Sequence, residues 1–456
     1  SRDSFYSKLA STPDHKLPSQ FGRMKISSER FGTASTNSIT DSESADVSTN
    51  AMEKASAVVS VSTSTSVEYV IVSGLCGGDA KKMACDDNNR HLKLVPMGSI
   101  AACVGSQGDM EKSGNVCFPS IEGMAFCFLP LPVQTQLPVH VNAYWELSSN
   151  RRDIWHGDDT SGDAKLRSNW NAFIVKDVLG PLYAKLIQFV SATFLKSQLG
   201  ALDNKQDVLR LLPCPLPQQD FWKSLGECVF TLIQSNCPIV WSNMKGGAYL
   251  SLGDCILLIK GSDDGSGSVA IANMENSDIL ESILLAENIP VCVVADVVGT
   301  TLSNASCVKG IVSPAYVRKH FTSLAPLNIL QTSVRSIITS PGGSKLSPNP
   351  SKSTATFRSA PHPSVDSSVG NLSVEKAFSN AIFLLQYCFK DITSENFELL
   401  HNVRLLPLDD GSLGKFIDIR SAELEGRESD AMYYTVTDLE RKILKEHCGN
   451  RLVVPD

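Results

Sequence analysis

Cys127, His140 and Asn142 are the residues whose types best suit covalent chemistry. A histidine can activate a thiol as a nucleophile, and an amide side chain can orient the imidazole. These residues allow a cysteine hydrolase as a remote alternative. Against it, Cys127 lies in the apolar run AFCFLPLP, where a cysteine behaves as a small apolar residue, and a single histidine in a strand is more often structural.

A second chemical motif lies at residues 263–267, whose sequence DDGSG matches the DxGxG nucleotide-binding signature of GHKL proteins. That signature works with a preceding helix that supplies a metal-binding asparagine and with a later glycine-rich lid. Neither accompanies residues 263–267, which suit a turn between two strands. Cys76 and Cys85 lack a second close pair of ligands, so no metal site is predicted. We therefore expect this chain to bind no cofactor by itself.

The element that would position His140 and Asn142 is predicted at residues 139–147, where apolar and polar residues alternate. This pattern is typical of a strand with one buried face. Two basic residues, Arg151 and Arg152, follow directly at its end. On the residues alone, they could be a solvated loop pair or form ion pairs with nearby acidic residues, which are Asp153, Asp158 and Asp159.

Helices are predicted after this strand. Ser168 or Asn169 is expected to cap the first of them. Gly180-Pro181 should kink or break it, because proline lacks a backbone donor. Further helices are predicted at residues 217–234 and from Ser313-Pro314, where the serine can cap and the proline suits the first helical position.

The fold class predicted is α+β and multidomain, with a mixed sheet and helices, then a mainly helical or mixed region, and disordered linkers. Ser340 and Ser347 precede prolines in a Ser/Pro-rich stretch, and they could be phosphorylated, although a tolerated spacer is the simpler interpretation. The predicted parts are a largely disordered linker (1–64), an α/β domain (65–200), a helical or mixed region (201–330), a flexible insert (331–371) and a helical or mixed continuation (372–456).

Composition narrows the classes of function. The net charge of -7 gives no electrostatic reason to bind nucleic acid or an anionic membrane. No apolar run reaches the roughly 18 residues that cross a bilayer.

The 13 cysteines are scattered and contain no CxxC pair, so we expect reduced thiols in a cytoplasmic protein. The chain starts without a methionine, and we expect it to be a fragment of a longer protein.

Residues 126–155 resemble the sacsin-type giant chaperones. The segment reads FCFLPLPVQTQLPVHVNAYWELSSNRRDIW, and FCFLPLP, LPVHVNG and SSNRR recur in that family after a GHKL-type ATP-binding module. The similarity continues, with gaps, to residue 415 through SNWNAFIVKDVLGPLYAKL, PIVWSNMKGGAYLSL, LLAENIPVCVVADVV, SPAYVRKHF, LLQYCFKDI and VRLLPLDDGSL. Gln136 and Ala143 depart from the family, which has glycine at both positions. The chain resembles an internal segment of a plant-like member of this family.

The resemblance implies a second α/β domain at residues 65–200, a sacsin-repeat region at 201–330, and an upstream module that binds ATP and Mg. In such ATPases a basic residue of the second domain contacts the terminal phosphate, and Arg151 or Arg152 is placed for that role. The whole protein would then be a chaperone or co-chaperone, with client proteins and a seventy-kilodalton heat-shock chaperone as partners. A non-catalytic scaffold is the alternative.

Overall fold

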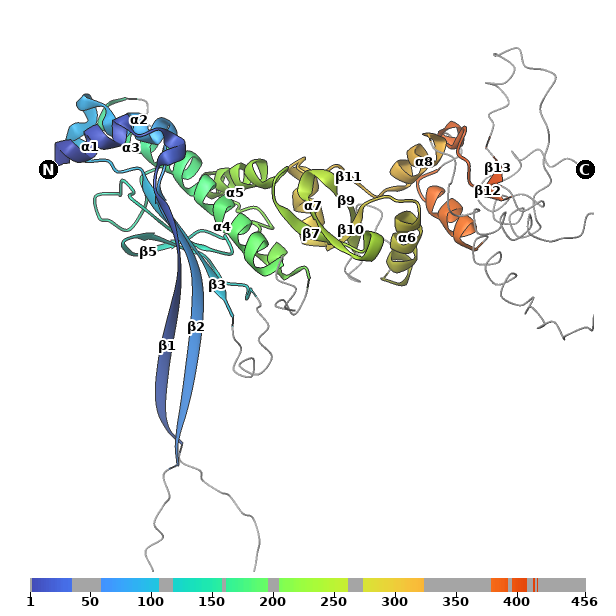
Figure 1. Ribbon diagram of the computed structural model, residues 1–456, viewed down its shortest axis with the longest axis horizontal. Coiled ribbons are helices and arrows are strands. Elements are labelled where there is room, and N and C mark those ends of the chain that lie inside the picture. The colour runs from blue at the N-terminus through green and yellow to red at the C-terminus, as the bar shows by residue number, and fades with distance from the viewer. Residues whose placement is uncertain are drawn as a thin grey trace, which may run out of the picture. The chain divides into compact units, whose positions relative to one another are not determined.

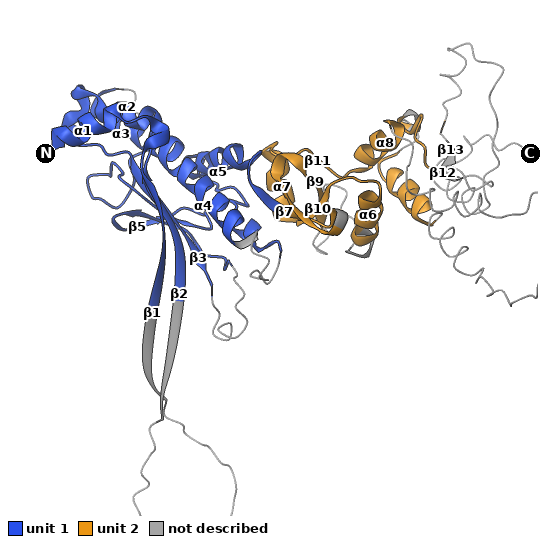
Figure 2. Cartoon of the chain, viewed as in Figure 1, with its two compact units in different colours: residues 1–239 blue, residues 240–456 orange. Residues whose placement is uncertain are grey.

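The computed structural model describes residues 2–34, 59–105, 118–157, 161–195, 205–260, 274–323, 379–392, 396–407, 413–414 and 416. The chain divides into two compact units, Ser1–Ile239 and Val240–Asp456 (Figure 2). Both units combine helices and strands (Figure 1), so the predicted α+β multidomain class is confirmed. The finer division into five parts stays a prediction.

A six-stranded mixed sheet forms the centre of the first unit, in the order β1-β2-β3-β6-β4-β5. All neighbouring strands are antiparallel except β4 and β6, which are parallel. Of the residues of β2, only Glu68–Leu75 pair with β3. The strands are β1 (Ser19–Ala34), β2 (Val59–Leu75), β3 (Met97–Val104), β4 (Met124–Cys127), β5 (Leu129–Gln134) and β6 (His140–Ala143).

Helices cover one face of this sheet, and α4 packs against β2 and β3 (Figure 1). Gly98 of β3 permits a close approach, because a Cβ there would lie 2.9 Å from a methyl carbon of Val178. The helices are α1 (Arg2–Ser11), α2 (Gly78–Cys85), α3 (Gly162–Phe173), α4 (Gly180–Val190) and α5 (Asp220–Ile233), with η1 (Asp14–Lys16), η2 (Asp87–Leu92), η4 (Ile174–Leu179), η5 (Ser191–Leu195) and η6 (Asp207–Leu211) as shorter helical turns.

The start of the helix after the sheet differs from the prediction. It begins at Gly162, with Ser161 in the N-cap position, rather than at Ser168 or Asn169. It also does not break at Gly180-Pro181, because the π-helical turn η4 joins α3 to α4 and places the proline in the first turn of α4. A proline lacks the amide for an i→i−4 hydrogen bond, and the wider π turn accommodates that loss.

Part of the predicted linker is also structured. Residues 2–11 form α1, so the expectation of a linker was wrong there. Tyr6 and Leu9 are buried, and the hydroxyl of Tyr6 donates a hydrogen bond to the carbonyl of Leu94 at 2.9 Å. Contacts with distant residues stabilise this helix, which the local sequence does not reveal. Residues 35–58 lie outside the described residues.

The second unit contains a parallel sheet in the order β10-β9-β11, and helices alternate with its strands along the chain. Its apolar core joins these elements to residues 381–392 and 400–405. The elements are β8 (Ala248–Ser251), β9 (Ile256–Lys260), β10 (Val291–Ala295), β11 (Gly310–Ile311), β12 (Leu406–Pro407), β13 (Leu413–Gly414), α6 (Met274–Ala286), α7 (Asp296–Asn304) and α8 (Pro314–Ser323), with η7 (Met244–Gly246), η8 (Leu252–Asp254) and η9 (Phe397–Leu400); β7 (Pro238–Ser242) pairs with β8.

Two of the remaining helix predictions are confirmed: α5 falls within residues 217–234, and α8 begins at Pro314. The hydroxyl oxygen of Ser313 accepts the amide of Tyr316 at 3.1 Å, as a cap should. The DDGSG motif, the insert at residues 331–371 with Ser340 and Ser347, and residues 417–456 lie outside the described residues.

Within the described part of the chain, no helix is both long enough and apolar enough to cross a membrane.

One carboxylate from the π turn accepts two backbone amides at the N-terminus of α2. An oxygen of Asp177 accepts the backbone amides of Asp79 and Ala80 at 2.6 and 3.0 Å. We expect Asp177→Ala to lower the free energy of unfolding of the first unit by about 1–2 kcal/mol, since two helix-terminal donors lose their acceptor. Asp177→Asn, which keeps an acceptor oxygen, should lose less in the same urea denaturation. Equal stability of Asp177→Ala and wild type would contradict the prediction.

Candidate functional site

Residues 146–155, which we term the arginine hairpin, contain the two predicted site residues. Leu147 and Ile154 form an antiparallel bridge. The amide of Trp155 donates to the carbonyl of Glu146 at 2.9 Å, and the amide of Ser148 donates to the carbonyl of Asp153 at 2.9 Å. The chain therefore reverses direction after the sheet and returns beside itself.

The tip of the hairpin is held by its own polar groups. The amide of Arg151 donates to the carbonyl of Ser148 at 2.8 Å. The side-chain oxygen of Asn150 accepts the hydroxyl of Ser148 at 2.7 Å and the amide of Arg152 at 2.9 Å. Arg151 adopts a φ of 54°, a left-handed conformation that non-glycine residues adopt at a cost. These hydrogen bonds offset that cost and fix the turn.

Both arginine side chains are exposed. Among the described residues, neither forms an ion pair within 4 Å. Asp153, one of the three carboxylates expected as possible partners, instead accepts the amide of Ile154 at 2.8 Å. Asp158 and Asp159 lie outside the described residues. Two adjacent guanidinium groups on a fixed turn can bind a phosphate or a carboxylate.

The strand predicted before the hairpin has the expected two faces. Val139, Val141, Ala143 and Trp145 are buried, and the residues between them are more exposed. The regular strand β6 is shorter than predicted, because its ladder spans only His140–Ala143. The indole nitrogen of Trp145 donates to the carbonyl of Phe126 at 3.1 Å, which fixes the backbone just before the hairpin.

The structure does not bring together the residues of the cysteine hydrolase alternative. Phe126 lies opposite Asn142 in the parallel pair of β4 and β6. Opposed residues share a face and successive residues alternate, so Cys127 points to the face opposite that of His140 and Asn142. The thiol and the imidazole are thus separated by the sheet.

The electrostatics of these three residues agree with a structural role. Burial raises the pKa of the Cys127 thiol, which disfavours the nucleophilic thiolate. His140 Nδ1 accepts the amide of Met124 at 3.1 Å, and the side-chain oxygen of Asn142 accepts the amide of Phe128 at 2.9 Å. Both side chains therefore bind the backbone of the β4 segment.

His140 predicts a pH dependence of stability. Burial lowers its pKa from 6.5, so between the folded pKa and about pH 6.5 the unfolded chain binds more protons. This contribution to stability is complete above pH 6.5 and is lost as pH falls through the folded pKa. His140→Gln keeps an acceptor for Met124 but does not titrate, so its free energy of unfolding should fall less between pH 6.5 and 5. Urea denaturation at several pH values measures this, and parallel curves would refute it.

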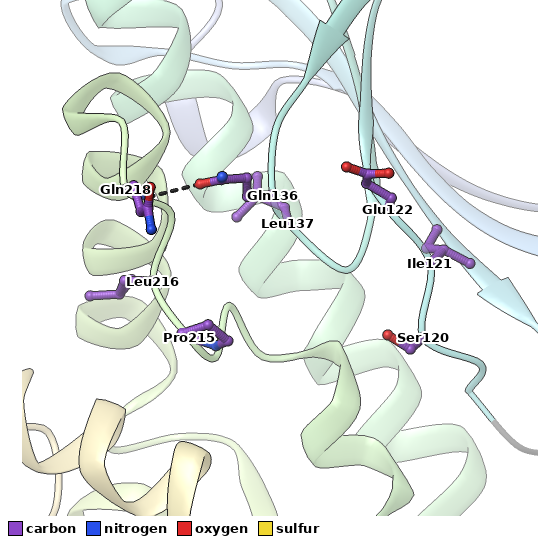
Figure 3. Close-up of a pocket in the computed structure, with 8 residues that line it drawn as sticks. All are labelled: Ser120, Ile121, Glu122, Gln136, Leu137, Pro215, Leu216 and Gln218. Carbon is purple, nitrogen blue, oxygen red and sulfur yellow. Dashed lines mark hydrogen bonds between the residues drawn. The ribbon is translucent and has the colours of Figure 1, made fainter.

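A cavity of about 400 Å³ lies elsewhere in the first unit (Figure 3). The side-chain oxygen of Gln136 accepts the amide of Gln218 at 2.9 Å at its edge. Glu122 is the one charged residue in its lining, which also contains Ser120, Ile121, Leu137, Pro215 and Leu216. No cluster of three or more potential metal ligands occurs in the described part of the chain.

The sequence analysis missed the residues of α3 that contact the hairpin. Asn171 is fully buried, and the guanidinium of Arg167 lies 3.6 Å from the carboxylate of Glu146. Burial raises the pKa of Glu146, and the positive charge of Arg167 offsets part of that rise. Asn171 lies three residues before Ile174 and so interrupts the apolar face of the helix. A polar residue on a buried face needs hydrogen-bond partners, and that signal could have identified it.

The fold and the site thus define an α+β protein of two units with a surface hairpin that presents two arginines. The chain is 34% identical to human sacsin over 108 residues, which are 24% of this chain and 2% of sacsin. A region of the chain is therefore similar to sacsin, and this region corresponds to a very small part of the sacsin sequence. No protein-family model matches the chain, and no solved structure matches it.

Proposed function

We propose that this chain is part of a sacsin-like chaperone or co-chaperone, in which the arginine hairpin contacts the terminal phosphate of ATP bound to a separate module. The observation that supports this proposal is the hairpin itself, whose fixed backbone presents two exposed arginines without an ion pair among the described residues. Similarity to sacsin supports the chaperone-related part.

In this proposal the hairpin acts electrostatically, by stabilising the negative charge of the phosphate. ATP supplies the phosphoryl group, and Mg bound with it in the separate module offsets part of the phosphate charge. Arg151 or Arg152 would donate hydrogen bonds to phosphate oxygens, and a guanidinium fixed in advance stabilises the charge that develops there. The remaining arginine would increase the local positive potential.

Contact with a terminal phosphate also offers a means of coupling. The hairpin would be bound when the terminal phosphate is present and released when it is gone, so the two modules would change their association with the nucleotide state. In this proposal that change acts on client proteins in the cytoplasm, with a seventy-kilodalton heat-shock chaperone as partner.

The experiment is ATP turnover by the full-length protein with Arg151→Ala and Arg152→Ala made one at a time. A decrease in at least one variant supports phosphate contact by the hairpin. Unchanged turnover in both variants would refute it.

A non-catalytic scaffold is the second candidate, and one observation favours it. Phe128 and Leu129, where β4 turns into β5, are 61% and 74% exposed. Neighbouring large apolar side chains on a surface are common at protein interaction sites. If neither arginine affects turnover, pull-down of client proteins with Phe128→Ser and Leu129→Ser tests this function, and undiminished binding would exclude these residues.

A further inference from the structure

We propose that Asn171 is the positioning residue of the arginine hairpin: it binds both strands of the hairpin to α3 and so holds the two arginines in place. The hairpin's role at a phosphate rests on the proposed function, whereas the positioning itself can be tested without it. Asn171 lies outside the hairpin, and its hydrogen bonds reach the hairpin at its base, away from the arginine tip.

Three hydrogen bonds carry this inference. The side-chain oxygen of Asn171 accepts the amide of Glu146 at 2.9 Å, and its side-chain nitrogen donates to the carbonyl of Glu146 at 2.7 Å. The same nitrogen donates to the carbonyl of Trp155 at 2.6 Å. Glu146 begins the hairpin and Trp155 ends it, so a single amide group bridges the two strands at their base.

The chemistry of the position is specific for asparagine. The Asn171 side chain is fully buried, and both of its donor hydrogens and its acceptor oxygen are used. Aspartate has the same shape but would place a second acceptor against the carbonyls of Glu146 and Trp155. Leucine has a similar volume and would remove all three hydrogen bonds, although the carbonyl of Glu146 would keep another donor, the amide of Trp155.

Neighbouring residues of α3 contact the same segment. Arg167 lies one turn before Asn171, on the same face of the helix, where its guanidinium is 3.6 Å from the carboxylate of Glu146 and 5.9 Å from the ring centre of Trp155. The indole nitrogen of Trp170 donates to the carbonyl of Tyr144 at 2.8 Å. α3 thus binds the chain at three places: at Tyr144 just before the hairpin, at Glu146 where the hairpin begins, and at Trp155 where it ends.

This attachment gives the hairpin a rigid support. α3 continues through η4 into α4, and the residues of η4 and α4 form much of the buried core against the sheet. Hydrogen bonds to such a helix limit the movement of a surface turn, because the buried helix can shift only by disturbing close packing. Asn171 therefore preorganises the arginines. Binding of a phosphate would not have to include the free-energy cost of ordering the loop.

The test uses hydrogen exchange of the whole chain and its cleavage by trypsin after Arg151 and Arg152. In Asn171→Leu and Asn171→Asp, the amides of residues 146–155 should exchange about tenfold faster, since each loses hydrogen bonds at the base of the hairpin. Cleavage at the two arginines should accelerate to a similar degree. The control Asn169→Ala, on the same helix, should match wild type in both measurements.

Several outcomes would overturn the inference. One is a folded Asn171→Leu or Asn171→Asp chain whose hairpin exchanges and is cleaved at the wild-type rate. Another is loss of the fold, seen by circular dichroism, in both variants, because Asn171 would then act on the core as a whole. A uniform rise of exchange throughout the first unit would lead to the same conclusion.

ATP turnover separates this inference from the proposed function. If both are right, Asn171→Asp should lower kcat of the full-length protein and leave KM for ATP unchanged, because the ATP-binding module is intact. If the arginine variants turn over ATP normally while Asn171→Asp still loosens the hairpin, the proposed function fails and the positioning role stands. If the arginine variants are slow but Asn171→Asp alters neither the hairpin nor kcat, the positioning role fails alone.

Discussion

ATP turnover by the full-length protein is expected to fall about a hundredfold when the phosphate-contacting residue of the Arg151 and Arg152 pair is replaced by alanine, the effect typical of losing one preorganised donor. The fold leaves both side chains exposed on a turn that is closed by two hydrogen bonds, which the side-chain oxygen of Asn150 accepts from the hydroxyl of Ser148 and the amide of Arg152. The backbone should therefore keep its shape in either variant, so the loss reports on the side chain. Phosphate release at saturating ATP measures kcat.

Matched variants make this result specific. Arg151→Lys and Arg152→Lys keep the positive charge but lose the planar, bidentate donor set, so the contacting position should remain impaired. Lys165→Ala removes an exposed positive charge from α3 and should leave kcat unchanged. A similar decrease for Lys165→Ala would indicate a general electrostatic effect, and equal kcat in all variants would refute phosphate contact.

Local patterns predicted the strand that leads to the hairpin better than the helix that follows it. The alternation of apolar and polar residues at 139–147 depends only on which face of the strand is buried. The structure keeps this alternation of burial from Val139 to Trp145, although the hydrogen-bonded ladder of β6 is short. The helix start was misplaced because residues 162–167 are mostly polar and carry no apolar period. The π turn before Pro181 could not be read locally, since packing on β3 holds it in place.

The candidate site was predictable only at its tip. Ser148 and Asn150 are turn-forming types, and the arginines after them are visible in the sequence. The hydrogen bonds from Asn171 join residues 25 and 16 positions apart, and their formation depends on where the tertiary fold places α3. Likewise, the separation of Cys127 from His140 follows from the register of β4 against β6, which neither residue type encodes.

Trp170→Ala is expected to lower the free energy of unfolding of the first unit by about 3–5 kcal/mol, the range for truncating a buried aromatic residue. Trp170 is fully buried and is among the largest side chains in the core. The substitution leaves a cavity in the core of the first unit and removes the donor bound to the carbonyl of Tyr144. Urea denaturation followed by far-ultraviolet circular dichroism measures the loss without depending on tryptophan fluorescence.

Trp170→Phe separates the two causes. Phenylalanine fills most of the volume but has no indole nitrogen, so it should cost about 1–2 kcal/mol, mainly for the unpaired carbonyl of Tyr144. Because Tyr144 lies two residues before the start of the arginine hairpin and Trp170 adjoins Asn171, hydrogen exchange at residues 146–155 should also rise in Trp170→Ala, and less in Trp170→Phe. A Trp170→Ala chain that loses less than about 1 kcal/mol would show that the core around Trp170 is not close-packed.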